Sequence, residues 1–146
     1  MSELKLDPQI YNSFIKEIEI RNIKLNSLNI YDVNEKLSEN IQLKLSLKFD
    51  NSEFKVEDKF LNIYSKFFVT VENENNGMIE KGFNIEFTYK LEYYIENIEQ
   101  FSEEYIHLFT TKNVPVNIWP YARELISSLT TRIGYPTLII EPLKTK

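Results

Sequence analysis

The sequence predicts an α+β fold, in which a four-stranded antiparallel sheet precedes C-terminal helices that pack on one side of it. Four segments between residues 18 and 95 alternate apolar and polar side chains, which is the period of a half-buried strand. No strand–helix–strand spacing separates these segments, and the last third changes to the helical period. Strands followed by helices are typical of an α+β domain, here one domain over residues 1–146.

The first predicted strand carries an interrupted alternation. Residues 1–13 have no clear period, and we expect a loose N-terminal segment there. The apolar positions that follow are Ile18, Ile20, Ile23, Leu25, Leu28 and Ile30. Two of these steps contain one residue too many for a period of two. We therefore expect a long strand with bulges near Asn22 and at Asn26 and Ser27, because one added residue returns the apolar set to the same face.

Three more strands follow after a polar connection at residues 32–40. Apolar residues alternate from Ile41 to Phe49 in the second strand, and from Phe83 to Ile95 in the fourth. The third strand, Phe60 to Glu72, is apolar on both faces. Asn73 to Gly77 then supplies turn residues that tolerate a positive φ. Hairpin-scale links of this kind predict an antiparallel sheet.

Two helices are predicted after the sheet. The first runs from Ser102, a suitable N-cap, to Lys112, and Asn113–Pro115 breaks it. The second would begin at Asn117, because Pro120 is tolerated only in a first turn. Gly134 would end it in a left-handed conformation, and Pro136 prevents continuation.

This last helix carries a family resemblance. Its start reads Pro120-Tyr-Ala-Arg-Glu124, and its exit joins Arg132 and Gly134 to the apolar run Tyr135–Pro142. The combined pattern resembles the SecB family of protein-export chaperones, closely over the last third and in the order of elements before it. The resemblance implies a short strand after Pro136 and a homotetramer, a dimer of dimers assembled through this helix. The candidate interface residues are Trp119, Tyr121, Arg123 and Ile126; packing within the chain is the alternative for the first three.

Composition limits the class of protein. The chain has 146 residues, of which 42% are hydrophobic and 27% charged, and no apolar run approaches the ~20 residues that span a bilayer. Its net charge of −5 is mixed along the chain, so we expect no nucleic-acid partner. The N-terminus lacks a signal-peptide pattern and cysteine is absent, which favours the cytoplasm.

Catalytic motifs are not visible. The single histidine, His107, has no fixed acid partner in the sequence, and the three glycines sit where turns or element ends are predicted. Adjacent acids such as Glu103 and Glu104 are interpreted as solvated charge, and Ser127 and Ser128 lie in mid-helix. We therefore expect no enzyme, no cofactor and no metal.

Aromatic residues, at 14% of the chain, give the strongest functional signal. Phe60, Tyr64 and Phe68 share one strand face, and Tyr94, Phe101 and Tyr105 gather near the junction of sheet and helix. These six residues are the candidate client-binding groove. The alternative is a core on both sides of the sheet, since most aromatics in small domains pack inside.

The resemblance implies an ATP-independent holdase that binds unfolded or precursor polypeptides. Family members hand precursors to the SecA translocation motor, and relatives of the fold serve one partner such as an antitoxin. The family's acidic contacts to the motor on its first strand appear here as Ser27 and Tyr31. The family also continues after the Pro142 region into a helix and tail, whereas this sequence stops at Lys146.

Overall fold

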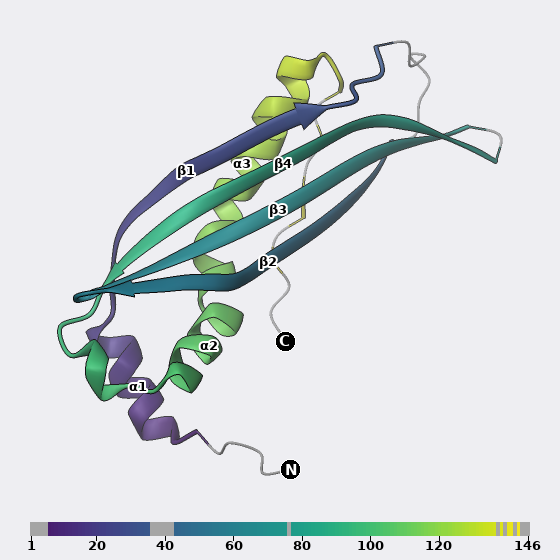
Figure 1. Ribbon diagram of the computed structural model, residues 1–146. Coiled ribbons are helices and arrows are strands. Elements are labelled where there is room, and N and C mark those ends of the chain that lie inside the picture. The colour runs from purple at the N-terminus through teal and green to yellow at the C-terminus, as the bar shows by residue number, and fades with distance from the viewer. Residues whose placement is uncertain are drawn as a thin grey trace.

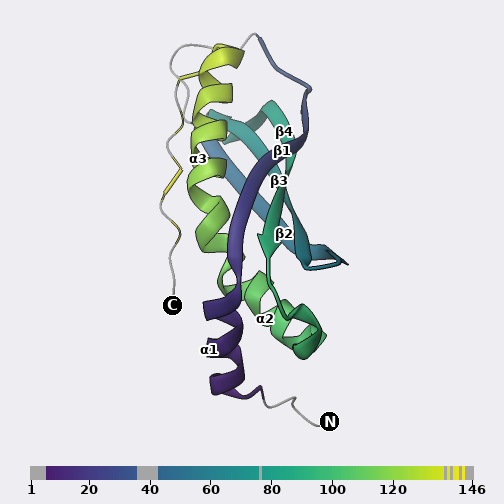
Figure 2. The same ribbon diagram turned by 90° about the vertical axis from the view of Figure 1, so that its left-hand side faces the viewer.

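One antiparallel sheet and one long helix make up most of the molecule (Figure 1). The computed structural model describes residues 6–35, 43–75, 77–136, 138, 140, 141 and 143. Helix α3 crosses one face of the sheet, whereas α1 and α2 lie beyond one end of the strands (Figures 1 and 2). This arrangement confirms the predicted α+β class. In chain order the elements are α1 (Pro8–Glu17), β1 (Glu19–Tyr31), β2 (Leu43–Glu57), β3 (Phe60–Asn75), β4 (Met78–Tyr94), a 3₁₀ turn (Ile98–Gln100), α2 (Glu103–Lys112) and α3 (Val114–Ile133).

The strand order is β1-β4-β3-β2, so β1 and β2 form opposite edges of the sheet. The expectation that all four strands are joined by hairpin-scale links is wrong for the first link. Hairpin loops usually contain about two to five residues, and the chain between Tyr31 and Leu43 is longer. In the observed strand order, this link joins β1 and β2, the two edge strands, and not two neighbouring strands.

Strand β1 contains the two predicted bulges. Its pairing with β4 shifts between Ile20 and Asn22 and again between Leu25 and Ser27. The added residues are Arg21 and Asn26, and the apolar set stays on the face toward α3 because each bulge absorbs one residue. The sequence predicts these bulges because the apolar residues of β1 are spaced by two except at two steps of three. One extra residue at each of those steps keeps all of them on one face.

The sequence predicted Gly82 at a turn or an element end, but it lies inside β4. Here the pairing with β3 shifts, since Val71 pairs with Phe83 and Glu72 with Lys81. A Cβ on Gly82 would lie 2.8 Å from the carbonyl oxygen of Val71, which explains the absence of a side chain. At the other end of the same strand pair, Asn75 pairs with Met78 and Gly77 has φ 78°, as predicted for the turn. Ile41 lies outside the described residues.

Helix α1 occupies residues 8–13 of the N-terminal segment that was expected to be loose over residues 1–13. Asp7 caps it by accepting a hydrogen bond from the Gln9 amide at 2.9 Å, and Pro8 occupies the first turn. Only Phe14 of this helix is fully buried, with its ring 5.5 Å from that of Phe109. A ten-residue helix with one buried side chain leaves little periodicity in the sequence, so the prediction missed it. Residues 1–5 lie outside the described residues.

Helix α3 begins earlier than predicted. It starts at Val114, directly after α2, and Pro115 occupies its first turn. Asn117 is therefore not the N-cap, and Pro120 lies inside the helix, where it has no N–H for the carbonyl of Val116. The C-terminal prediction is confirmed. Gly134 has φ 97°, and the Tyr135 amide donates to the Thr130 carbonyl at 3.1 Å, which closes the last turn.

The core lies between α3 and the two central strands. The rings of Phe67 and Phe87 stack at 4.9 Å between centroids, below Ile118, Ala122 and Ile126 of the helix. The side chain of Tyr93 is also buried, and burial raises the pKa of its phenol to about 12. Asn117 donates to this hydroxyl at 2.8 Å, which ties the start of α3 to the sheet.

Replacing Pro120 tests the helix boundary. Pro120 is exposed and lies inside α3, so Pro120→Ala restores a backbone donor without opening a cavity. We expect the free energy of unfolding to rise by about 1–3 kcal/mol, measured by urea denaturation. Val116→Ala, an exposed control one turn earlier, should change it by less than about 1 kcal/mol. A loss of stability in Pro120→Ala would show that the proline ring supports the fold.

Candidate functional site

Four aromatic side chains form a row on the sheet face that points away from α3. Phe60, Tyr64 and Phe68 occupy every fourth position of β3, so about 13 Å separates neighbours along the strand. Tyr94 of β4 pairs with Phe60, with 5.5 Å between ring centroids. Phe60 is 37% exposed and Phe68 44%, whereas Tyr64 and Tyr94 are half-buried. We call these four residues the aromatic row; they are four of the six predicted groove residues.

Charged groups fix one end of the aromatic row. The guanidinium of Arg21, the extra residue of the first β1 bulge, lies 4.7 Å from the centroid of the Tyr94 ring. The Tyr94 hydroxyl donates to Glu96, and this hydrogen bond raises the pKa of the phenol. Lys59 donates to the same carboxylate at 2.7 Å and lowers the pKa of Glu96. Tyr94 is thus held in one orientation from both sides.

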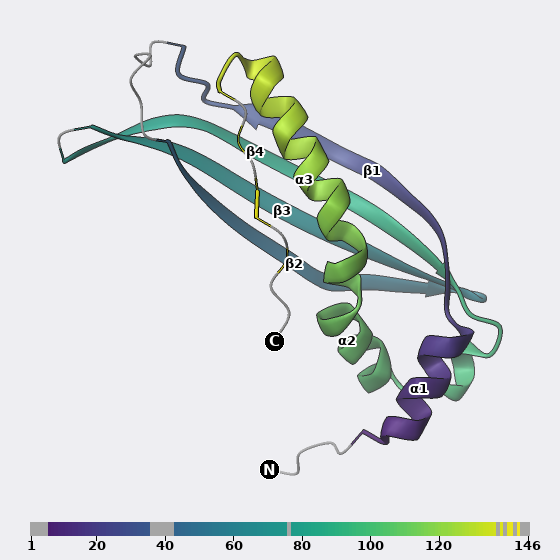
Figure 3. The same cartoon turned by 180° about the vertical axis from the view of Figure 1, so that it is seen from behind.

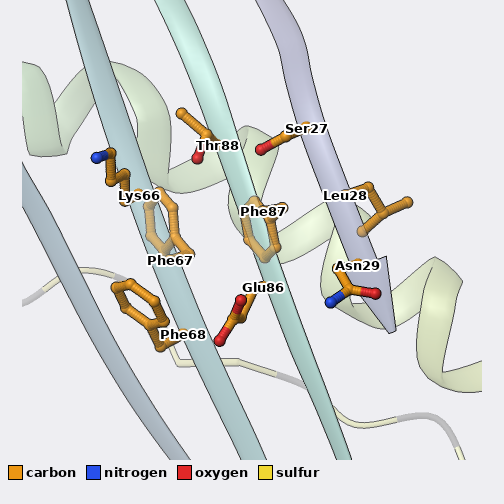
Figure 4. Close-up of a pocket in the computed structure, with 9 residues that line it drawn as sticks. All are labelled: Ser27, Leu28, Asn29, Lys66, Phe67, Phe68, Glu86, Phe87 and Thr88. Carbon is orange, nitrogen blue, oxygen red and sulfur yellow. The ribbon is translucent and has the colours of Figure 1, made fainter. Parts of the chain in front are cut away.

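Phe68 stands between two shallow hollows in the sheet surface. One has a volume of about 290 Å³ and reaches across β4 to Ser27 and Asn29 of β1. The other, of about 460 Å³, extends toward Tyr31 and toward Lys48 of β2. Figure 4 shows the first hollow, with the Phe68 ring and the Glu86 carboxylate projecting from neighbouring strands. Both hollows include these two residues, so an incoming side chain would meet an apolar ring beside an acid.

The polar rim around Phe68 is already organised. Tyr31 donates its hydroxyl to Glu86 at 2.9 Å, and this hydrogen bond raises the pKa of the Tyr31 phenol. Lys66 lies 3.7 Å from Glu53 across the neighbouring strand. Both signs of charge therefore surround the ring, which suits contacts with polypeptide side chains better than binding of a polyanion.

Phe101 and Tyr105 do not join the aromatic row, so the structure does not bring the six predicted groove residues together. Tyr105 is only 8% exposed, and its hydroxyl accepts a hydrogen bond from the Asp7 amide at 3.1 Å. Phe101 packs between Phe14 and Tyr105, with ring centroids 5.0 and 6.4 Å away. Both residues lie against α1, which the sequence analysis had not predicted, and they belong to a small core at the end of the sheet.

The four candidate interface residues on α3 have different surroundings. Ile126 is fully buried on the side of the helix that faces the sheet, so it packs within the chain. Trp119 and Arg123 donate hydrogen bonds to backbone carbonyls of Glu141 and Ile140, both at 2.8 Å. Only Tyr121, 47% exposed and in ring contact with Tyr89 at 6.1 Å, presents a large free surface. A role of this helix in assembly stays a prediction.

Sequence reasoning missed a second set of exposed apolar side chains, on the helix side of the two edge strands. An α-helix is about 10 Å wide, whereas four strands span about 15 Å between their axes. One helix therefore covers β3 and β4 but leaves the edges open. The sequence did contain a signal for these exposed residues. Both edge strands alternate apolar and polar residues, and only one long helix is available to cover their apolar side. The residues are Ile20, Leu25 and Leu28 on β1 and Phe49 and Val56 on β2.

The described part of the chain shows no cluster suited to metal binding. Among those residues, no three His, Cys, Asp or Glu side chains come together to hold a metal ion. His107 is exposed, with its ring 5.4 Å from that of Phe54. None of the described helices is long and apolar enough to cross a membrane.

Comparison with known proteins gives one consistent result. Residues 7–145 match the family model for the preprotein translocase subunit SecB. The protein-export protein SecB of the Wolbachia of Brugia malayi is 27% identical over 152 residues, covering 98% of this chain and 86% of that protein. The protein-export protein SecB of Cereibacter sphaeroides is 33% identical over 101 residues, covering 69% of this chain and 57% of that protein.

A solved structure shares the fold. A SecB-like chaperone of Mycobacterium tuberculosis, in complex with a ChAD peptide from an antitoxin, superimposes with a TM-score of 0.83. The two proteins are 16% identical, and the match covers 94% of this chain and 99% of the other. At this identity the comparison supports the arrangement of helices and strands.

Adjacent phenylalanines on β3 test which sheet face is core. Phe67 is fully buried, whereas Phe68 points to the opposite face. We expect Phe67→Ser to lower the free energy of unfolding by about 3–5 kcal/mol through loss of packing. Phe68→Ser should lower it by less than about 1 kcal/mol. Equal losses in urea denaturation would mean that the second face is also covered, and that the aromatic row is not an exposed surface.

Proposed function

Because the chain belongs to the SecB family, we propose that it is an ATP-independent holdase for unfolded or precursor polypeptides. The observation that carries the proposal is the aromatic row, which leaves two phenylalanine rings about 40% exposed on a sheet face. Each exposed ring offers an apolar contact, and the two rings are spaced along one strand face. An unfolded client offers apolar side chains in no fixed order, and rings spaced along a flat strand accept them without a sequence requirement.

The energetics suit reversible binding at several points. An aromatic side chain carries about 150–250 Å² of surface, so covering the 44% exposed fraction of Phe68 removes roughly 90 Å² from water. At about 25 cal/mol per Å² this contact contributes about 2 kcal/mol. One ring holds a client weakly. Several rings contacted by one long chain hold it firmly and release it stepwise to an acceptor, with no chemical step.

A homotetramer in the cytoplasm is part of the proposal. Strand β1 pairs only with β4 among the described residues, and its helix-side apolar residues Leu25 and Leu28 are about 40% exposed. Tyr121 of α3 adds to this uncovered surface. A second copy of the chain would remove both from water.

A dedicated chaperone for one partner is the second candidate. It is favoured by the antitoxin peptide bound to the structurally similar mycobacterial chaperone. In addition, Ser27 and Tyr31 stand at the two positions of the first strand where the resemblance implies acidic contacts to the motor, so a motor that needs carboxylates at those two positions would meet hydroxyls. Co-purification from the native host separates the two: one stoichiometric partner supports the dedicated chaperone, and a spread of precursors supports the general holdase.

Aggregation of a chemically unfolded protein tests the holdase directly. We expect a several-fold excess of the chain to suppress light scattering by the diluted client. Replacing Phe60 and Phe68 together by serine should raise the concentration needed for half suppression about tenfold or more, since about 1.4 kcal/mol corresponds to a factor of ten.

The matched control is Lys44→Ser, an exposed residue on the same sheet face in the neighbouring strand β2, outside both hollows. It should leave suppression within about twofold, and the melting temperature of each variant shows that it is folded. If the double variant suppresses aggregation as well as the unaltered chain, the aromatic row is not part of the client-binding site. No suppression by the unaltered chain would reject the holdase.

A further inference from the structure

The aromatic row lies on the most regular part of the sheet. Strand β3 pairs with β4 without interruption from Phe60 to Val71, which is the longest unbroken run of pairing between two described strands. The bulged residues belong to the edge strands β1 and β2, and to β4 beyond the partner of Val71. A strand without a bulge rises by a constant ~3.3 Å per residue. Phe60, Tyr64 and Phe68 are therefore evenly spaced, and the three rings span about 26 Å.

Polar residues separate these three rings on the same face of β3. Asn62 lies between Phe60 and Tyr64 and is only 6% exposed, so neighbouring side chains fill the surface there. Lys66 lies between Tyr64 and Phe68, and its ammonium is 3.7 Å from a carboxylate of β2. Aromatic and polar residues thus take turns along this face. Apolar contact is available at intervals of about 13 Å and not as a continuous stripe.

No described helix crosses this face of the sheet. Figure 3 shows α3 on the other face, with the C-terminal segment beside it. Helix α3 holds that segment there through hydrogen bonds to its backbone carbonyls. The described residues Leu138, Ile140 and Glu141 form no strand, which corrects the short strand expected after Pro136 as far as those residues go. A client on the aromatic row therefore meets no competing segment of the described chain.

An extended client laid along β3 has the same geometry as the three rings. Its backbone also rises by about 3.3 Å per residue, and alternate side chains point to the same side. Residues i, i+4 and i+8 of the client therefore reach the rings, while residues i+2 and i+6 lie over Asn62 and Lys66. A helical client does not fit in this way. Its side chains at i and i+4 are only about 6 Å apart, so they reach one ring.

We propose that the aromatic row favours one class of client segment, an extended chain in which apolar residues recur at every fourth position with polar residues between them. This inference rests on the proposed holdase function. The rings do not distinguish one apolar residue from another, so the preference concerns spacing alone and is graded in affinity. A segment with another spacing contacts one ring at a time, whereas a segment with this spacing contacts three.

The same spacing marks the apolar face of an amphipathic helix, where residues i, i+4 and i+8 lie on one side. Segments that form surface helices in the folded client are thus bound best while they are unfolded and extended. Helix formation brings their apolar side chains from about 13 Å to about 6 Å apart, which removes two of the three contacts. Binding to the aromatic row and helix formation in the client therefore exclude each other.

Two synthetic peptides of equal length and composition test the spacing. The first carries three phenylalanines at every fourth position among serine and threonine, and two prolines prevent a helix. The second carries the phenylalanines at every third position, so the middle ring points away from the other two in an extended chain. We expect the full-length protein, titrated in ¹H–¹⁵N spectra, to bind the first peptide about tenfold more tightly or better.

A helical form of the first peptide tests the excluded conformation. Alanine replaces both prolines, and a covalent bridge between side chains on the polar side locks the helix. The phenylalanines keep their positions in the sequence, but they are now about 6 Å apart. We expect this form to bind no more tightly than the second peptide.

Variants at the two ends of the row show where the first peptide lies. Phe60→Ser and Phe68→Ser should each weaken its binding several-fold, because each removes one of three contacts. The second peptide should lose less than about twofold in either variant, since it reaches one ring at a time and another ring remains. Lys44→Ser, exposed on the same face of β2, is the control and should leave both affinities unchanged. The melting temperature shows that each variant is folded.

The outcomes separate this inference from the holdase. Equal affinities for the two peptides, or no binding of either, would overturn the spacing preference while suppression of aggregation still supports the holdase. Tighter binding of the first peptide that survives both serine substitutions would also overturn it, because the peptide would then lie elsewhere. No suppression of aggregation would reject the holdase and the preference with it. Tighter binding that depends on Phe60 and Phe68 supports both.

Discussion

The packing of a single helix on a four-stranded sheet is the constraint on which the rest of the structure depends. Helix α3 buries Ile118, Ala122 and Ile126 against the central strands, and the stacked rings of Phe67 and Phe87 lie beneath it. This contact stabilises the domain, but a helix about 10 Å wide cannot cover the whole sheet. Some apolar residues of both edge strands, and Phe60 and Phe68 on the opposite face, therefore stay exposed. Apolar side chains in those places are available for partners.

The two faces of the sheet have different surroundings because side chains alternate along a strand. On β3, Phe67 faces the helix, and its neighbour Phe68 faces solvent between two hollows. The same alternation separates stability from binding, since exposed rings can change without disturbing the core. A chaperone needs this separation, because its binding surface must stay apolar while its fold stays soluble and stable.

Local patterns predicted the local features of this fold. The β1 bulges followed from the alternation of apolar residues, and the end of α3 followed from Gly134 and its neighbours. The sequence does not predict the early start of α3 because Pro120 and Pro115 both suit a first turn, and Pro115 fills that place. The burial of Tyr105 depends on Asp7, 98 residues away. The partners of Trp119 and Arg123 are backbone carbonyls, which no side-chain pattern reveals.

Site-specific photo-crosslinking tests the central claim most directly, namely that rings left uncovered on the sheet contact unfolded chains. A benzophenone amino acid at position 68 replaces one ring with another at the same place, and position 44, exposed on the same face of β2 and outside both hollows, is the comparison. The account predicts that position 68 crosslinks an unfolded client strongly, position 44 weakly, and that neither crosslinks the same client once it is folded. A client that binds the chain without crosslinking to position 68 would contradict it.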